Sequence, residues 1–368
     1  MLHRRAFLQT AAATTAGSLI ATSALAEELP DPKVPLPPPR NWNEPASAME
    51  PDPAFVAFDP RGAALNGGTA SMRRIWTGGQ FTEGPVWFGD WHRLVWSDIP
   101  TDTLYEWNQW TGETRVFRHP SGHANGNTRD RQGRLLTCEH GNRRLTRTEY
   151  TGAITVLADN YQGKKLNSPN GVIVKSDDTI WFTDATYGLI LEHQGYKRGE
   201  PEIHPNVYMI DPKTGKMTIV ADDFSEPNGL CFSPDEKKLY ITDTGVLGGK
   251  PVSGSGPAPS WIRVFDVTED NKLTNGKVFH DLKDTPGAIA DDIRSDTNGN
   301  IWSAGGWGTD KNYNGVSIYA PDGTPIARII LPEIAANLCF GGRDHNTLYI
   351  CASTSMYALN VNATGVEL

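Results

Sequence analysis

Short apolar runs of β type alternate with turns rich in Gly, Asn, Asp and Pro from about residue 70 onward, without a long helical period. One pattern recurs six times in this region: a polar residue opens an apolar run, and 10 or 11 residues later an apolar pair opens a second run. Turns such as Asp-Arg-Gln-Gly at 130–133 separate the two runs, so each copy predicts an antiparallel pair of strands. The six opening residues are Glu83, Asn125, Asn170, Asn228, Asp291 and Asn337.

The spacing of these copies predicts the architecture. Successive copies begin 42, 45, 58, 63 and 46 residues apart, and a four-stranded propeller blade needs about 40–45 residues. The two wide gaps contain polar insertions, 191–205 and 246–260, which are expected to be loops. The chain is therefore predicted to be all-β, a six-bladed β-propeller around a central channel. Pairing of 72–76 with the strand at 355–360 would close the ring and remove its exposed edges.

The segments before the repeats predict two further regions. Paired arginines precede Phe7-Leu8, a weakly apolar stretch follows, and Ala24-Leu25-Ala26 has the pattern of a cleavage site. Residues 1–26 are thus expected to be a twin-arginine signal, with the twin-arginine export machinery as a partner and a periplasmic or secreted location. The alternative is an N-terminal anchor or tail. Residues 27–68 are rich in Pro and are expected to form an extended arm, with the propeller at 69–368.

Charge and cysteine content narrow the classes of partner. The formal net charge is −9 and becomes −11 without residues 1–26, which removes two arginines and no acid. This acidic balance argues against nucleic acid and, once the signal is cleaved, against anionic membranes. The four cysteines, at 138, 231, 339 and 351, have no zinc-ligand spacing and lie in apolar runs. Buried free thiols are favoured, with a Cys339–Cys351 disulfide as the alternative.

The opening residues of the six copies carry the candidate chemistry. Equivalent positions on the innermost strands of a propeller converge at one mouth of its channel. Carboxylates and carboxamides supply oxygen ligands, which suit Ca²⁺, Mg²⁺ or Mn²⁺ better than Zn²⁺. Glu83 and Asp291 would neutralise a divalent cation, while Asn170 and Asn228 would add neutral donors. The alternative is that Asn-Gly and Asp-Asp only form turns at strand starts.

The motifs also carry a family resemblance. The sequence resembles the family of senescence marker protein, gluconolactonase and luciferin-regenerating enzyme, most closely its bacterial gluconolactonase branch. The similar stretches are Phe-Thr-Glu-Gly-Pro-Val-Trp at 81–87, His-Ala-Asn-Gly-Asn-Thr-Arg-Asp-Arg-Gln-Gly-Arg at 123–134, Leu-Asn-Ser-Pro-Asn at 166–170, Pro-Asn-Gly-Leu at 227–230 and Phe-Ser-Pro-Asp-Glu at 232–236.

The resemblance implies a propeller with one catalytic divalent cation held by Glu83, Asn170, Asn228 and Asp291. Ca²⁺ is the first choice, and Mn²⁺, Mg²⁺ and Zn²⁺ are alternatives. Two neighbours depart from the family pattern. Gly171 stands where the family commonly has Asp, and Asp292 stands where it commonly has Gly.

The expected reaction is attack of water on the carbonyl of a sugar-type lactone that the metal polarises. Asp291 is the candidate general base. Substrate hydroxyls need polar partners, and the candidates by position are Asn125, His123, His140 and Tyr187. Two alternatives stay open, namely hydrolysis of a phosphotriester or aryl ester at the same site, and a propeller that only binds. Asp98, Asp184 and Asp243 end their strands and are expected to stabilise blades.

Overall fold

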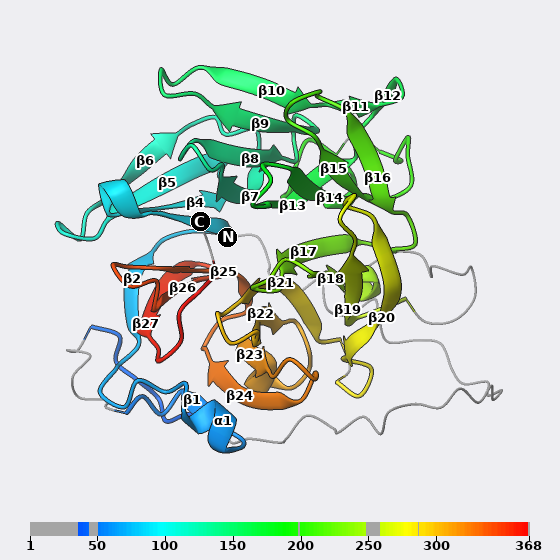
Figure 1. The fold of residues 1–368 in the computed structure, drawn as a ribbon. Coiled ribbons are helices and arrows are strands. Elements are labelled where there is room, and N and C mark those ends of the chain that lie inside the picture. The colour runs from blue at the N-terminus through cyan, green and yellow to red at the C-terminus, as the bar shows by residue number, and fades with distance from the viewer. Residues whose placement is uncertain (1–35, 44–50, 198, 248–257, 286, 367–368) are drawn as a thin grey trace. The chain divides into compact units, whose positions relative to one another are not determined.

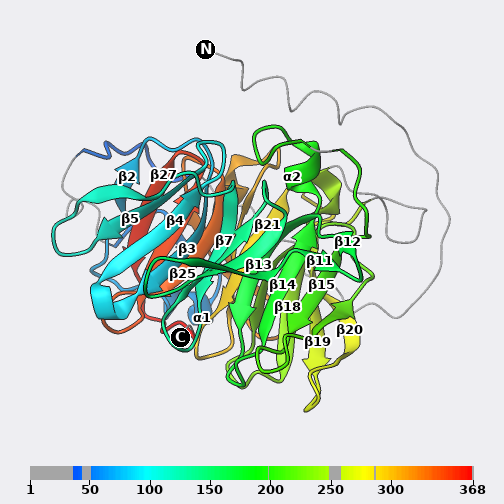
Figure 2. The same ribbon diagram turned by 90° about the horizontal axis from the view of Figure 1, so that it is seen from above.

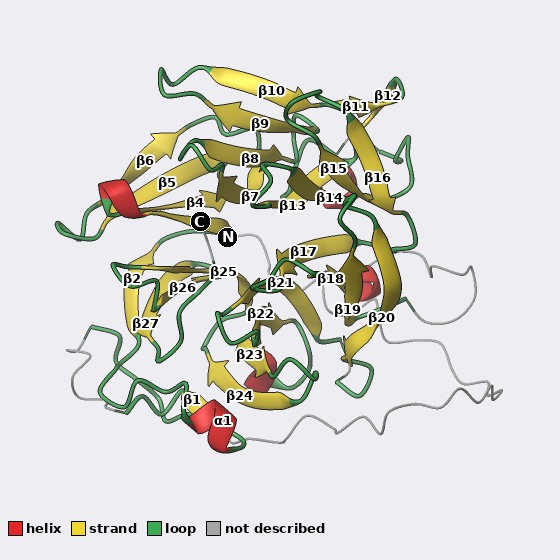
Figure 3. Ribbon diagram, viewed as in Figure 1, coloured by secondary structure: helices red, strands yellow, loops and turns green. Residues whose placement is uncertain are grey.

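The computed structural model describes residues 36–43, 51–197, 199–247, 258–285 and 287–366, and in this part of the chain it is a ring of six antiparallel sheets. Figure 1 looks down the ring, with the first strand of each blade nearest the centre, and Figure 3 shows that strands and loops make up nearly all of it. The all-β, six-bladed propeller predicted from the repeats is confirmed. The signal predicted at 1–26 lies outside the described residues.

Each of the first four blades consists of four consecutive strands. The fifth blade has four consecutive strands and one more from the N-terminal region, and the sixth has three consecutive strands and one from that region. From the axis outward, the first three blades are β3 (Thr82–Phe88), β4 (Arg93–Asp98), β5 (Thr103–Asn108) and β6 (Thr114–Arg118); β7 (Ala124–Arg129), β8 (Leu135–Glu139), β9 (Arg144–Thr148) and β10 (Ile154–Ala158); and β13 (Ser168–Val174), β14 (Ile180–Ala185), β15 (Asn206–Ile210) and β16 (Met217–Ala221). The last three are β17 (Pro227–Phe232), β18 (Lys238–Asp243), β19 (Trp261–Val267) and β20 (Leu273–Asp281); β21 (Ile289–Ser295), β22 (Ile301–Gly306), β23 (Gly315–Tyr319), β24 (Pro325–Ile330) and β1 (Phe55–Ala57); and β25 (Ala335–Gly341), β26 (Thr347–Ala352), β27 (Ser355–Asn360) and β2 (Arg73–Thr77).

The hydrophobic core lies between neighbouring blades. One cluster joins the second and third blades through Leu136, Leu145, Phe182 and Tyr208, and another joins the fifth and sixth through Trp302, Ile318 and Phe340. Burial of these large side chains, at about 25 cal/mol per Å² of apolar surface, holds the sheets face to face. The apolar alternation of the strands therefore specifies blade packing and leaves the polar positions for the axis.

The N-terminal region closes the ring. The strand β2 pairs with β27, as expected for the residues at 72–76, with its bounds one residue later. The predicted extended arm also contributes a strand, because β1 pairs with β24 on the outside of the fifth blade. The buried carboxylate of Asp52 accepts hydrogen bonds from the backbone N–H groups of Ala54 and Met72 and pairs with Arg40 at 2.5 Å, which ties the arm to the sixth blade.

The remaining elements are short. They are β11 (Asn160–Tyr161) with β12 (Lys164–Lys165), the helices α1 (Pro60–Ala63) and α2 (Tyr187–Ile190), and the 3₁₀ turns η3 (Gly89–Trp91), η4 (Gly245–Leu247) and η5 (Lys311–Tyr313). The insertion at 191–205 has no strand in its described part, as expected, and most of 246–260 lies outside the described residues. Figure 2 shows α2 at one end of the strands. None of the helices seen in the described residues has the length and apolar character needed to cross a membrane.

All four cysteines are free and buried, in agreement with the favoured prediction.

The recurring Asn-Gly pairs have a packing role. They lie inside buried inner strands, so the alternative that they form turns is wrong. At each of these sites a β-bulge places two residues of the inner strand opposite one residue of the next strand. A Cβ on Gly126 would lie 2.1 Å from the carbonyl oxygen of Asn170, and a Cβ on Gly171 would lie 2.8 Å from that of Asn228. Glycine thus lets the inner strands of neighbouring blades meet backbone to backbone.

We predict that Gly126→Ala destabilises the protein by at least about 2 kcal/mol, because a rigid backbone carbonyl occupies the space that the new methyl needs. The control is Gly89→Ala, since the nearest atom to its added Cβ is 3.6 Å away, and its effect should stay within about 0.5 kcal/mol. Urea unfolding measures both free energies. Equal stability of the two variants would contradict this account of the Asn-Gly pairs.

Candidate functional site

The six opening residues lie at equivalent places, at or near the start of the innermost strand of each blade. They are Glu83 on β3, Asn125 on β7, Asn170 on β13, Asn228 on β17, Asp291 on β21 and Asn337 on β25. Each is at most 5% exposed. The six inner strands surround the axis (Figure 1), so the six opening residues lie around it. Interactions of the side chains relate Glu83, Asn228, Asp291 and Asn337 to one another or to Asp292.

Three carboxylates form the charged part of this region. The Asn337 carboxamide donates from Nδ2 to Glu83 Oε2 at 2.8 Å and to Asp292 Oδ2 at 2.6 Å. Arg294 pairs with the other oxygen of Asp292 at 2.7 Å, and both side chains are buried. The Asn337 side chain therefore links two acids through its NH₂ group. Its Oδ1 accepts a hydrogen bond from the backbone N–H of Leu338.

The carboxyl groups of Glu83 and Asp291 are strongly perturbed. Burial and the nearby charge of Asp292 raise the pKa of Glu83 to about 8. Burial and the charges of Glu83 and Asp292 raise the pKa of Asp291 well above its usual range, against an opposing hydrogen bond from Asn228. If all three acids are ionised, one guanidinium balances only one of them, and two negative charges remain at the axis. Such a cluster is costly unless a cation or protons neutralise it.

Hydrogen bonds with Thr244, and through it with Tyr187, hold the Asn228 carboxamide. Its Nδ2 donates to Thr244 Oγ1 at 3.3 Å, and the Tyr187 hydroxyl bonds the same Thr244 oxygen at 2.5 Å. Tyr187, proposed from the sequence to contact substrate, is 4% exposed and lies behind Asn228 in this network. Its contact with the site is indirect, through Thr244.

The two histidines among the substrate candidates, His123 and His140, differ in burial and in their contacts. His140 is fully buried, its Nε2 is 3.2 Å from Asn125 Nδ2, and its Nδ1 is 3.2 Å from the carbonyl oxygen of Gln194. His123 is half-buried, its Nδ1 donates to the carbonyl of Ile99 at 2.8 Å, and its ring lies edge-on to Tyr196. His140 thus contacts Asn125 directly, whereas the contacts described for His123 are with Ile99 and Tyr196.

Hydroxyl groups on the second strands fix the backbone of the site, a role that the sequence reasoning missed. Ser97 donates to the carbonyl of Asn125 at 2.7 Å, Thr183 to that of Asn228 at 2.6 Å, and Thr242 to that of Asp291 at 2.7 Å. Each hydroxyl belongs to one blade and the carbonyl to another. The signal was present as a Ser/Thr-Asp pair ending the second strand.

The acids of the Ser/Thr-Asp pairs behave as expected. Asp98 accepts from the backbone N–H groups of Gln80 and Phe81, Asp184 accepts from that of Asn167, and Asp243 accepts from those of Ser225 and Glu226. These bonds anchor the loop that leads into each inner strand. The three acids therefore stabilise blades and position the neighbouring site residues.

The residues present fit a hard divalent cation. Glu83 and Asp291 can supply the charge, and Asn170 and Asn228 can supply neutral oxygens. No cluster of three or more His, Cys, Asp or Glu side chains with metal-binding geometry exists among the described residues. The donor set depends on carboxamides, which distinguishes it from a zinc site.

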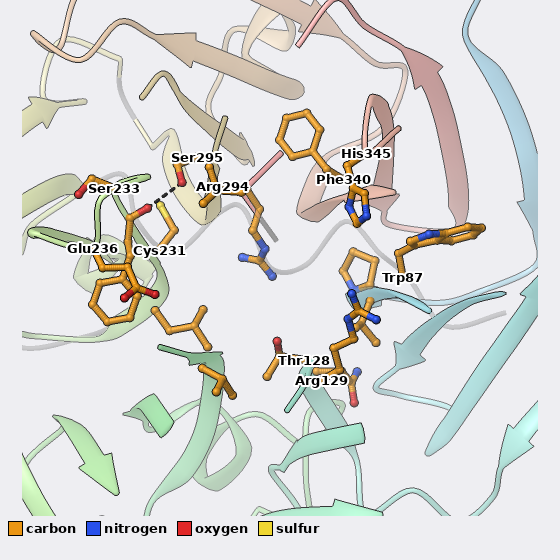
Figure 4. A pocket seen from close by; sticks show the side chains of 17 residues that line it. Trp87, Thr128, Arg129, Cys231, Ser233, Glu236, Arg294, Ser295, Phe340 and His345 are labelled. Carbon is orange, nitrogen blue, oxygen red and sulfur yellow. Dashed lines mark hydrogen bonds between the residues drawn. The ribbon is translucent and has the colours of Figure 1, made fainter. Parts of the chain in front are cut away.

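A separate cavity of about 100 Å³ lies further along the same inner strands. Its lining includes Arg129, Arg294 and His345, and Figure 4 shows the arginine side chains of β7 and β21 reaching into it. Arg294 follows Asp291 by three residues, which is about 10 Å along a strand. This cavity is distinct from the site of the opening residues, although Arg294 joins the two by its ion pair with Asp292.

Comparisons with known proteins agree with this fold. The family model of the SMP-30/gluconolactonase/LRE-like region matches residues 81–354. A gluconolactonase of Zymomonas mobilis is 28% identical over 334 residues, which cover 84% of this chain and 87% of that protein. The structure of a gluconolactonase from Xanthomonas campestris has a TM-score of 0.73 and 31% identity, covering 83% of this chain and 94% of the other.

A more distant structure shares the fold alone. The calcium-binding protein regucalcin from Agrobacterium tumefaciens superposes with a TM-score of 0.61 at 20% identity, covering 79% of this chain and 94% of that one. The family match extends over all six inner strands, from Glu83 to Asn337, and so includes every candidate ligand. The chain belongs to the SMP-30/gluconolactonase/LRE-like family.

Proposed function

We propose that this protein is a divalent-cation-dependent hydrolase that opens sugar-type lactones. The observation that carries the proposal is the buried cluster of Glu83, Asp291 and Asp292, in which the only ion pair shown among the described residues joins Asp292 to Arg294. With all three acids ionised, two negative charges would be in excess and would match a divalent cation, and the two carboxylates with Asn170 and Asn228 would provide oxygen donors. Membership of a family with gluconolactonases supports a lactone as substrate.

Calcium is the proposed native ion. The donors are all oxygens, and the carboxamides are neutral ligands that Ca²⁺ accepts readily in coordination of six to eight. Zn²⁺ prefers nitrogen and sulfur in tetrahedral geometry. Mn²⁺ and Mg²⁺ accept similar ligands, and they are expected to support lower activity.

The side chains of the site would have different roles in the reaction. A bound cation would polarise the lactone carbonyl and stabilise negative charge on its oxygen. With a cation bound, Asp291 would be ionised and would accept the proton of the attacking water. Glu83, which accepts a hydrogen bond from Asn337, would be ionised under the same condition and would act as a counter-charge. Asn125 and His123 would accept or donate hydrogen bonds with the sugar hydroxyls. Asp291 would then give this proton to the ring oxygen as its bond to the carbonyl carbon breaks, which yields the hydroxy acid.

We predict that Glu83→Gln and Asp291→Asn each lower kcat/KM for aldonolactones by at least about 100-fold, because each removes half of the charge that holds the cation. The control is Asp322→Asn, whose side chain is 63% exposed, and its activity should be unchanged. Acid release in weak buffer measures the rates. Full activity in both site variants would contradict the assignment, and hydrolysis of phosphotriesters without any lactonase activity would favour the alternative substrate class.

We also predict that added Ca²⁺ stabilises the metal-free protein more at pH 8.5 than at pH 5.5. The raised pKa of Glu83, about 8, means that the metal-free fold binds an extra proton between its unfolded pKa and pH 8. The stability from this group is therefore present at low pH and is lost as the pH rises through 8. Ca²⁺ binds the ionised form, and a concentration of 100 Kd would add about 3 kcal/mol.

Thermal unfolding with and without Ca²⁺ at the two pH values measures this difference. In Glu83→Gln the pH dependence of the calcium effect should shrink, because one of the titrating ligands is gone. An equal rise in Tm at both pH values, or no rise at all, would contradict the proposed ligand set.

A further inference from the structure

The contacts of His140 define a chain of hydrogen bonds with a fixed direction. The Nδ1 of His140 faces the backbone carbonyl of Gln194, and its Nε2 faces Nδ2 of Asn125, each at 3.2 Å. A carbonyl oxygen can only accept, so Nδ1 must carry a proton. Burial lowers the pKa of His140 to about 3, which keeps the ring neutral. In a neutral ring with Nδ1–H, Nε2 can only accept a hydrogen bond.

The direction of this chain decides how the Asn125 carboxamide is turned. Because Nε2 accepts, Asn125 must offer its NH₂ group to His140, and its Oδ1 must point elsewhere. That oxygen is buried and has no hydrogen-bond partner among the described residues. A buried amide oxygen without a partner costs free energy unless something binds it.

The acceptor that faces Nδ1 of His140 belongs to the segment at 191–205. Gln194 lies in this insertion, and α2, which precedes it, packs directly on His140. A Cβ on Gly188 would lie 2.7 Å from Cβ of His140, and a Cβ on Gly195 would lie 2.3 Å from the carbonyl oxygen of Gly188. These close approaches show that α2 packs tightly against His140 and against the insertion. The imidazole ring of His140 therefore connects Gln194 of the insertion to Asn125.

We propose that His140 is a positioning residue that turns the Asn125 carboxamide so that Oδ1 accepts a hydrogen bond from a hydroxyl of the lactone, with the 191–205 segment setting the tautomer through Gln194. This proposal rests on the proposed lactonase function. His140 itself is 0% exposed, so it acts through Asn125 and not on substrate. The insertion thereby contributes to selection of polyhydroxylated lactones over lactones that lack hydroxyl groups.

The first test determines which ring nitrogen of His140 carries the proton, and it does not require a measurement of enzymatic activity. Protein labelled with ¹⁵N-histidine is examined by long-range ¹H–¹⁵N correlation NMR at pH 7, and His140→Gln identifies the signals of this ring. The expected result is a neutral ring protonated at Nδ1. A ring protonated at Nε2, or at both nitrogens, would overturn the proposal. This outcome is independent of whether the wild-type protein hydrolyses lactones, so it separates this inference from the proposed function.

The second test uses a double-mutant cycle on an aldonolactone and on a simple lactone without hydroxyl groups. His140→Leu should lower kcat/KM for the aldonolactone by about 10- to 100-fold, since a buried amide loses its acceptor. His140→Gln can offer an oxygen to Asn125 and an NH₂ group to Gln194, and it should stay within about fivefold of wild type. For the simple lactone, His140→Leu should change the rate less than about threefold.

In an Asn125→Ala background, His140→Leu should have less than about a threefold further effect. Thr146→Val is the matched control, because Thr146 is also fully buried in the second blade and bonds Glu139 instead of Asn125. Equal losses from His140→Leu in both backgrounds, or on both lactones, would overturn the positioning role. If the leucine variant does not fold, the glutamine variant and the tautomer measurement still decide the question.

Discussion

Three carboxylates, those of Glu83, Asp291 and Asp292, are buried where the inner strands of neighbouring blades meet, and the guanidinium of Arg294 balances one of them. Burial of unbalanced charge is among the most expensive arrangements in a folded protein. The raised pKa values of Glu83 and Asp291 express this cost. A divalent cation would remove it and would at the same time provide the electrophile that a lactonase needs. The need for positive charge at the axis thus connects the fold to the proposed reaction.

The other residues of the site fix the positions of the polar groups around these carboxylates. Glycines at the bulges bring the inner strands together, and hydroxyl groups of Ser97, Thr183 and Thr242 clamp carbonyls of other blades. Thr244 and His140 then orient the carboxamides of Asn228 and Asn125. Because carboxamides can present either oxygen or nitrogen, such supports determine whether a ring of Asn side chains can receive a cation or a hydroxyl.

The repeats predicted the six blades because apolar alternation and turn chemistry are local, and the polar residue that interrupts each inner strand marks the axis. The same logic located Glu83, Asn170, Asn228 and Asp291 without a structure. It could not find the groups behind them. Tyr187 and His140 were expected to touch substrate, yet both support carboxamides, and that distinction depends on burial between blades. Gln194 contributes a backbone carbonyl, which leaves no mark in the sequence, and the β1 pairing of the Pro-rich arm is equally a long-range contact.

Whether the axial cluster holds one divalent cation can be seen in a crystal structure grown with Ca²⁺ or Mn²⁺ and measured for anomalous scattering. We expect a single strong axial peak, with oxygens of Glu83, Asp291, Asn170 and Asn228 at about 2.0–2.6 Å. Absence of a peak there, or a peak coordinated by other residues, would contradict it.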